Sequence, residues 1–206
     1  MTGGAEGSNA EANEAQKKVA RLLEAVNGGD RAALGEVFAL LYDELREIAH
    51  RQRRRWRGEY TLNTTALVHE AYVKLVGPAR IGAENDGHFR ALAARAMRHI
   101  LCDYARRSGA RRRGGGLERV SFDELKAPSR TVVFTAEQSE ILLALDDAMR
   151  RLEGIDPRQS EVVECRFFGG LTIEETATAI GISPRTVKRD WALAQAWLHR
   201  EMTSRV

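Results

Sequence analysis

The sequence predicts an all-α protein in which two small helical domains are joined by a flexible linker. Apolar residues recur at helical spacing along most of the 206-residue chain, and no segment alternates like a half-buried strand. This periodicity stops between residues 111 and 137, in a glycine-rich stretch that would be unusually long for a loop inside one compact domain. We therefore expect a disordered leader (1–15), a first domain (16–110), a linker (111–135) and a second domain (136–206).

Composition argues against several classes of protein. Cys102 and Cys165 are far apart and the five histidines are scattered, so neither a disulfide framework nor a metal site is expected. No apolar run approaches the roughly 20 residues that cross a bilayer, and the first residues lack a secretion signal. No catalytic constellation is recognisable. We expect a cytoplasmic protein that is not an enzyme, holds no cofactor and is not inserted in a membrane.

Positive charge is concentrated although the net charge is only +3. Arginine clusters in "RQRRRWR" (51–57) and again in "RRSGARRR" (106–113). Concentrated basic patches favour a polyanionic partner, most often nucleic acid. The alternative is that both runs are solvated helix ends or loops.

Three helices are expected in the first domain. Asp30 can cap a helix whose apolar stripe runs from Leu34 to Ile48. A second helix should span about 65–76 and end before a Gly-Pro pair, and a third should span about 87–107. The third helix has one apolar face and one cationic face. Its apolar face carries Phe89, Ala93, Ala96, Ile100 and Tyr104, and its cationic face carries Arg95, Arg98 and Arg106.

The second domain should contain four helices, and the last two read as a helix-turn-helix. The signals that start and stop these helices are, in order, Gly154, Asp156-Pro157, the capping-box pair Thr172 and Glu175, Gly181, and Ser183-Pro184. Val187, Trp191, Ala194 and Leu198 of the fourth helix would pack inward. The outward-facing residues, which we predict to bind DNA in the major groove, are Ser183, Arg185, Thr186, Lys188 and Arg189. The alternative is an ordinary helical hairpin with a solvated basic face.

Three segments resemble bacterial sigma factors of the extracytoplasmic-function (ECF) group. "LTIEETATAIGISPRTVKRDWALAQAWL" is similar to the domain of that family that binds the minus-thirty-five promoter element. "HFRALAARAMRHILCDYARR" (88–107) is similar to its minus-ten-reading, strand-opening helix, and "ALVHEAYVKLV" resembles its polymerase-docking helix. The resemblance covers nearly the whole chain after the leader.

This resemblance implies a factor that brings core RNA polymerase to promoter DNA, with contacts on the β′ clamp and the β flap. The docking residues that it implies are Leu67, Val68, His69, Glu70 and Tyr72. The implied minus-ten contacts are Asn85, Arg95, Arg98, His99, Arg106 and Arg107. Open strands are commonly held in a cationic groove of this kind.

The chain departs from the family pattern at four positions. Leu92 and His99 stand where a tryptophan and an asparagine are usual in the minus-ten helix, so promoter details are not carried over there. Asp190 and Trp191 stand where many relatives have an arginine and an aliphatic residue. The "TVKRDW" segment resembles a particular subgroup of the family.

The docking helix also begins without the acidic run that many relatives place before it. This chain has Thr64 and Thr65 instead, and either threonine could simply be a helix N-cap. The sharper hypothesis is phosphorylation of Thr64 or Thr65, which would supply negative charge where the helix dipole favours it. A Ser/Thr kinase would then regulate the chain instead of, or beside, an anti-sigma protein. The main rival function is a stand-alone helix-turn-helix regulator, which binds DNA without docking on polymerase.

Overall fold

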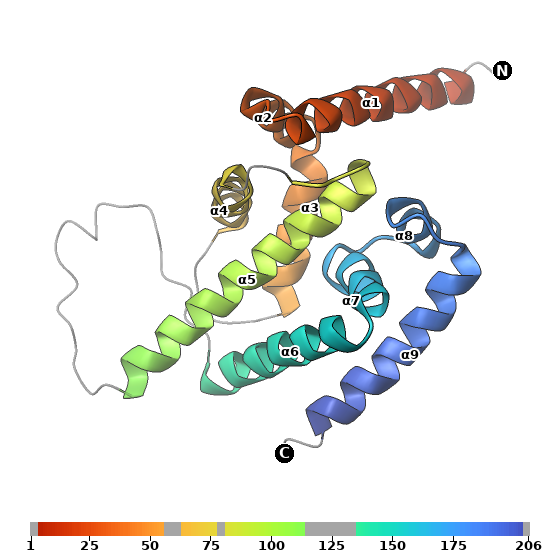
Figure 1. Ribbon diagram of the computed structural model, residues 1–206. Coiled ribbons are helices and arrows are strands. Elements are labelled where there is room, and N and C mark those ends of the chain that lie inside the picture. Colours follow the sequence, from red (N-terminus) through yellow and green to blue (C-terminus); the bar gives the residue numbers. More distant parts are fainter. Residues whose placement is uncertain (1–3, 56–62, 78–80, 114–134, 204–206) are drawn as a thin grey trace, which may run out of the picture.

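A computed structural model describes residues 4–55, 63–77, 81–113 and 135–203 of the chain (Figure 1). The described residues form helices and connecting turns. In order, the elements are α1 (Gly4–Asn27), α2 (Arg31–Leu40), α3 (Tyr42–Arg55), α4 (Thr64–Val76), α5 (Asp86–Arg113), α6 (Ala136–Ile155), α7 (Pro157–Val163), the π-helical turn η1 (Glu164–Phe168), α8 (Ile173–Ala179) and α9 (Pro184–Thr203). The all-α prediction is confirmed for these residues.

The first five helices are organised around α5. Helices α3 and α4 pack against α5, and α1 lies across α2 at one end of the group (Figure 1). The ring of Phe38 on α2 meets Tyr72 of α4 and Phe89 of α5 edge-on, with centroid distances of 5.0 and 5.4 Å. Phe89 is fully buried, so the apolar face that the sequence predicted for α5 is the face that forms the core.

Two features of this half differ from the sequence prediction. Asp30 caps α2 as expected, because its Oδ1 accepts a hydrogen bond from the Ala32 amide at 2.9 Å. However, the single predicted helix is divided at Leu41 into α2 and α3. Leu41 is buried on the same core as the stripe residues on either side, so apolar spacing alone does not reveal the bend. The structure also differs from the predicted disordered leader (1–15), because helix α1 already begins at Gly4. The segment is rich in alanine and glutamate, which favour helix formation.

The start of α4 corrects one prediction about the threonines. Neither Thr64 nor Thr65 is the N-cap of this helix. Asn63 occupies that position, with extended backbone angles, and its Oδ1 accepts a hydrogen bond from the Ala66 amide at 2.7 Å. Asparagine is at least as good a cap as threonine. The two threonines are therefore the first two residues of the helix and are free of the capping role.

The predicted start signals of the second half are confirmed. Asp156 caps α7 with Pro157 at the first helical position. Thr172 and Glu175 form both hydrogen bonds of a capping box at the start of α8. Gly181 has φ +68°, a conformation that suits glycine, and this residue makes the tight turn between α8 and α9.

The two halves of the chain are packed against each other. Helices α6 and α8 and the turn η1 all contact α5, the long helix of the first half (Figure 1). Arg51 of α3 also reaches the second half, where it donates a hydrogen bond to the Gly169 carbonyl oxygen at 2.8 Å. One continuous cluster of buried apolar residues includes members of both halves. The predicted linker lies mostly outside the described residues, and independent movement of two domains on that linker stays a prediction.

Candidate nucleic-acid interface

The N-terminal half of α9 presents an exposed basic surface. Arg185, Lys188 and Arg189 are exposed on successive turns. Ser183 precedes the helix and accepts a hydrogen bond from the Thr186 amide at 3.1 Å, so its hydroxyl acts as a cap. The five residues predicted to bind DNA are thus brought together at one helix start. Four of them are exposed and Thr186 is half-buried.

The opposite side of α9 is held by the core and by one buried carboxylate. Val187, Ala194 and Leu198 are buried as predicted, and Trp191 is half-buried. Sequence reasoning missed the role of Asp190, which is only 1% exposed. Its two oxygens accept hydrogen bonds from Arg158 of α7 at 2.6 Å and from Arg189 at 3.0 Å. Burial opposes ionisation, but these two hydrogen bonds hold the pKa of Asp190 below its usual value.

The predicted minus-ten face of α5 is partly covered in this structure. Arg98 is 2% exposed and donates hydrogen bonds to Asp146 of α6 and Glu164 of η1, instead of facing solvent as the sequence predicted. Arg95 donates to both oxygens of Glu153 at 2.7 and 2.9 Å. The cationic face that we expected for DNA is therefore paired with acids of the second half.

The other predicted minus-ten residues lie along the same helix. Arg106 is exposed and reaches the Asp146 carboxylate at 2.9 Å, while Arg107 lies over the Tyr104 ring at 5.6 Å. Asn85 caps α5, because its Oδ1 accepts from the His88 amide at 2.8 Å. His99 is half-buried, and burial together with the nearby Arg98 lowers its pKa to about 4.

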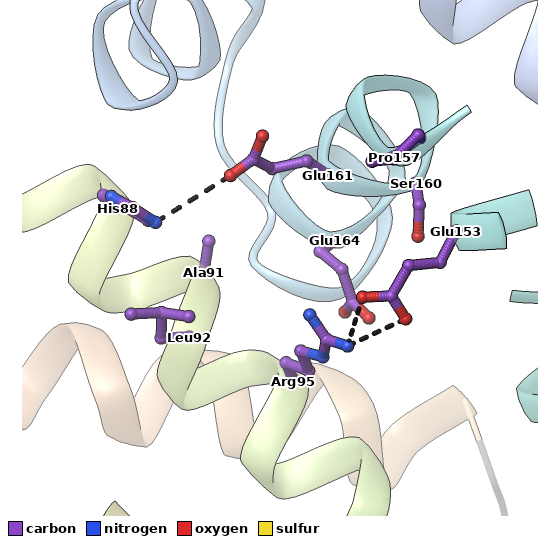
Figure 2. Close-up of a pocket in the computed structure, with 9 residues that line it drawn as sticks. All are labelled: His88, Ala91, Leu92, Arg95, Glu153, Pro157, Ser160, Glu161 and Glu164. Atoms are coloured by element: carbon purple, nitrogen blue, oxygen red, sulfur yellow. Dashed lines mark hydrogen bonds and ion pairs between the residues drawn. The ribbon is translucent and has the colours of Figure 1, made fainter. Parts of the chain in front are cut away.

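A hollow of about 170 Å³ lies along the line where α5 meets α6 and α7 (Figure 2). Figure 2 shows His88 and Arg95 reaching from α5 toward the acids of the second half. His88 lies 3.8 Å from Glu161, and Arg95 forms the double hydrogen bond to Glu153. The hollow is thus bordered by both members of the Arg95–Glu153 ion pair and by His88 with Glu161.

Sequence reasoning missed the acids of this contact. Asp146 follows Leu145 within the apolar stripe of α6, one turn from both Leu142 and Met149. An acid in that register is unusual unless a cation meets it. The position of this acid was therefore the sequence signal for a buried cation. In the structure, three arginines contact the Asp146 carboxylate. They are Arg98, Arg106 and Arg150.

Comparison with protein families gives one assignment. The model of the family described as ECF sigma factor matches residues 16–204. The chain belongs to the ECF sigma factor family. Comparison with curated proteins and with solved structures gives no match.

Family membership makes this chain a DNA-binding sigma factor, which acts with RNA polymerase in transcription initiation. Within the part of the chain that the structure describes, no helix is long and apolar enough to cross a membrane.

In this ECF sigma factor the predicted docking residues of α4 divide into two groups. Leu67 and Val68 are buried, so in this structure they form part of the core. His69 is exposed and stacks on the half-buried Tyr72, with a centroid distance of 6.3 Å. Glu70 accepts a hydrogen bond from the Tyr104 hydroxyl at 2.6 Å, which links α4 to α5.

An apolar hollow of about 180 Å³ opens beside these residues, between α2 and α4. It is lined by Phe38, Ala39, Tyr42, Thr65, Val68, His69 and Tyr72. Thr65 is exposed at its edge. Thr64 lies on the other side of the helix start, where its Oγ1 accepts a hydrogen bond from Arg53 of α3 at 2.8 Å.

Proposed function

We propose that this ECF sigma factor reads its promoter with two faces. The start of α9 binds the minus-thirty-five duplex through Arg185, Lys188 and Arg189, with the hydroxyls of Ser183 and Thr186 beside them. The cationic face of α5 holds the minus-ten strands. The observation that carries the first part is the exposed basic start of α9 after the Gly181 turn, because a helix presented in this way fits a major groove.

The division into two domains, 16–110 and 136–206, belongs to the same proposal. Minus-thirty-five and minus-ten elements are separate sites on DNA, so one chain that reads both needs two binding faces. The "TVKRDW" segment at the start of α9 supports the assignment of this chain to a subgroup of the family that has its own promoter preference. A stand-alone helix-turn-helix regulator is not favoured, because the family match extends through the first five helices.

The second part of the proposal is that α4 docks on the polymerase clamp and that phosphorylation of Thr64 or Thr65 permits docking. The observation that carries it is the hydrogen bond from Arg53 to Thr64. Thr64 and Thr65 open the helix, and the first turn of α4 contains no acidic residue. A phosphate there adds about −1.5 to −2 charges at the positive end of the helix dipole.

Arg53 is placed to hold such a phosphate. Its Nη1 is already 2.8 Å from the oxygen that would be modified, so a phosphate on Thr64 meets a guanidinium without a large movement of α3. Thr65 is the more exposed of the two and borders the apolar hollow next to His69 and Tyr72. The regulator would be a Ser/Thr kinase, acting in place of or together with an anti-sigma protein.

The test is binding of the full chain to core RNA polymerase, followed by promoter-dependent transcription. The unmodified protein is compared with proteins that carry phosphothreonine at position 64 or at position 65, and with Thr64→Ala and Thr65→Ala. We expect tight binding only for a phosphorylated protein. Equal binding by the unmodified chain would reject the phosphorylation switch and keep the sigma assignment.

A further inference from the structure

The contact between α5 and the second half of the chain is organised by charge. Every one of four arginines on α5 meets at least one acid that comes from α6, η1 or α8. Arg98 is enclosed by Asp146 and Glu164, all three being at most 5% exposed. The other arginines of α5 that meet these acids are Arg90 with Glu175, Arg95 with Glu153, and Arg106 with Asp146.

We infer that the acidic face formed by Asp146, Glu153, Glu164 and Glu175 is a binding surface for the minus-ten face of the same chain, and that in the free protein it stands where promoter DNA would bind. This acidic face is called the masking face below. The inference rests on the proposed role of α5. It goes beyond that role because it assigns the second half of the chain a further task, which is to hold the DNA-binding arginines until DNA and polymerase replace it.

The chemistry of the contact suits an exchange with DNA. Carboxylates and phosphates bind guanidinium groups with the same paired geometry, so a DNA strand can replace the acids and leave each arginine partnered. Burial works to lower the pKa of Arg98, but Glu164 and Asp146 outweigh it and raise this pKa overall. The arginine is therefore fully charged in the contact, as a phosphate ligand must be.

The apolar part of the contact includes the core cluster that both halves share and a smaller cluster at its α8 end. Ala91 of α5 packs with Cys165, Leu171 and Ala179 of the second half. Buried ion pairs add little net stability, because loss of hydration offsets most of their attraction. The ion pairs give this contact the polar character of interdomain interfaces that open.

Close approach of α8 to the start of α5 depends on one glycine. A Cβ atom added at Gly87 would lie 2.9 Å from the Cβ of Ala179, closer than real Cβ atoms approach one another. Asn85, two residues earlier, donates hydrogen bonds to the carbonyl oxygens of Thr178 and Ala179 at 3.4 and 3.2 Å. A methyl group at position 87 must therefore push the two halves apart at this end of the contact.

The recognition surface of α9 is not part of the masking contact. Arg185, Lys188 and Arg189 remain exposed and have no contact with the masking face, whereas Arg90, Arg95, Arg98 and Arg106 of α5 are paired with it. The closed chain can thus still bind duplex DNA through α9, and only binding of single strands is suppressed. This difference gives the experiment an internal control.

The native cysteines report whether the contact is open. Both thiols are free and buried, and burial raises the pKa of each to about 12. Cys165 packs against Ala91 of α5, so separation of the halves uncovers it.

The test measures the rate at which a small disulfide reagent modifies Cys165 in a full-length Cys102→Ala protein. The same proteins are titrated with a short, fluorescein-labelled single-stranded DNA of mixed sequence and with a duplex.

Two independent changes should open the contact. Gly87→Ala introduces the clash with Ala179, and Glu153→Lys places a like charge opposite Arg95 at a partly exposed position. If nine-tenths of the free chain is closed, each change speeds Cys165 modification and tightens single-strand binding by up to about tenfold. Duplex binding should stay the same. Adding Ala179→Gly to Gly87→Ala removes the clashing methyl group and should return both properties toward the parent values.

The possible outcomes distinguish failure of the masking contact from failure of the proposed minus-ten function of α5. Unchanged Cys165 modification in both opened variants, with circular dichroism showing a normal fold, would overturn the masking contact. Faster modification without any change in single-strand binding would show that the contact exists but does not cover a DNA site. That second result rejects both the masking role and the proposed minus-ten function of α5. Faster modification with tighter binding, reversed by Ala179→Gly, supports the inference.

Discussion

The carboxylate of Asp190 lies 2.6 Å from Nε of Arg158 and so ties the recognition helix α9 to α7. The other oxygen of Asp190 holds Arg189, one of the residues that we propose to contact the minus-thirty-five element. Asp190 itself is buried and cannot reach DNA in this arrangement. The acid that departs from the family pattern is thus a positioning residue for its neighbour.

Asp190→Asn should weaken both folding and duplex recognition. The amide keeps the shape of the side chain but loses the charge that two arginines share, so we expect a decrease of about 1–3 kcal/mol in the free energy of unfolding. Arg158 and Arg189 can turn to solvent and remain hydrated in the variant, so the decrease in the free energy of unfolding should lie in the lower part of that range. Urea unfolding measures the stability. Duplex binding measured against Arg158→Ala, which removes only the α7 contact, shows whether Arg189 has lost its orientation.

Arg53→Ala should affect only the phosphorylated protein. Arg53 donates to Thr64, whereas its neighbour Arg54 is exposed, so Arg54→Ala removes an equal charge from the same helix as a matched control. We expect Arg53→Ala to weaken binding of the Thr64-phosphorylated chain to core polymerase about tenfold, which corresponds to one charge-assisted hydrogen bond. Equal losses for the two variants would mean that Arg53 contributes only general positive charge.

Alanine substitutions at two glycines should change stability in opposite directions. Gly181 has φ +68° with open space around its Cα, so Gly181→Ala costs about 1–2 kcal/mol through the backbone alone. Gly154 lies inside α6 and also faces open space, so Gly154→Ala should stabilise the protein by about 0.5–1 kcal/mol. Thermal unfolding of both variants checks this. A stabilising effect at position 181 would be incompatible with the left-handed turn.

Local signals in the sequence predicted most of the helices and the exposed half of the site. Asp30, Asp156 and Thr172 were identified as caps because capping depends on residues two or three positions apart. The basic start of α9 was predicted for the same reason, since turn, cap and charge lie within one short segment.

The burial of Arg98 could not be predicted from local signals. Its partners, Asp146 and Glu164, are 48 and 66 residues away. Amphipathic periodicity identifies the cationic face of α5 but does not say whether that face meets solvent, DNA or another part of the chain. The acid within the apolar stripe of α6 was the only hint that a buried cation would be found.

His99 should make the folded protein less stable as the solution becomes acidic. In the folded chain its pKa is about 4, below its ordinary value of 6.5, because burial and the charge of Arg98 disfavour the protonated ring. Between pH 6.5 and about 4 the unfolded chain therefore binds a proton at this position that the folded chain does not. The free energy of unfolding then falls as pH falls.

His99→Gln isolates this contribution, because glutamine has no titratable group and the carboxylates of the contact remain in both proteins. We expect the variant to lose less stability than the parent between pH 7 and pH 4.5. Above pH 7 the free energies of unfolding of the two proteins should depend on pH in the same way. Urea unfolding at several pH values measures the difference. Parallel curves across the whole range would mean that His99 titrates alike in the folded and unfolded chains, and would place its ring in water instead of beside Arg98.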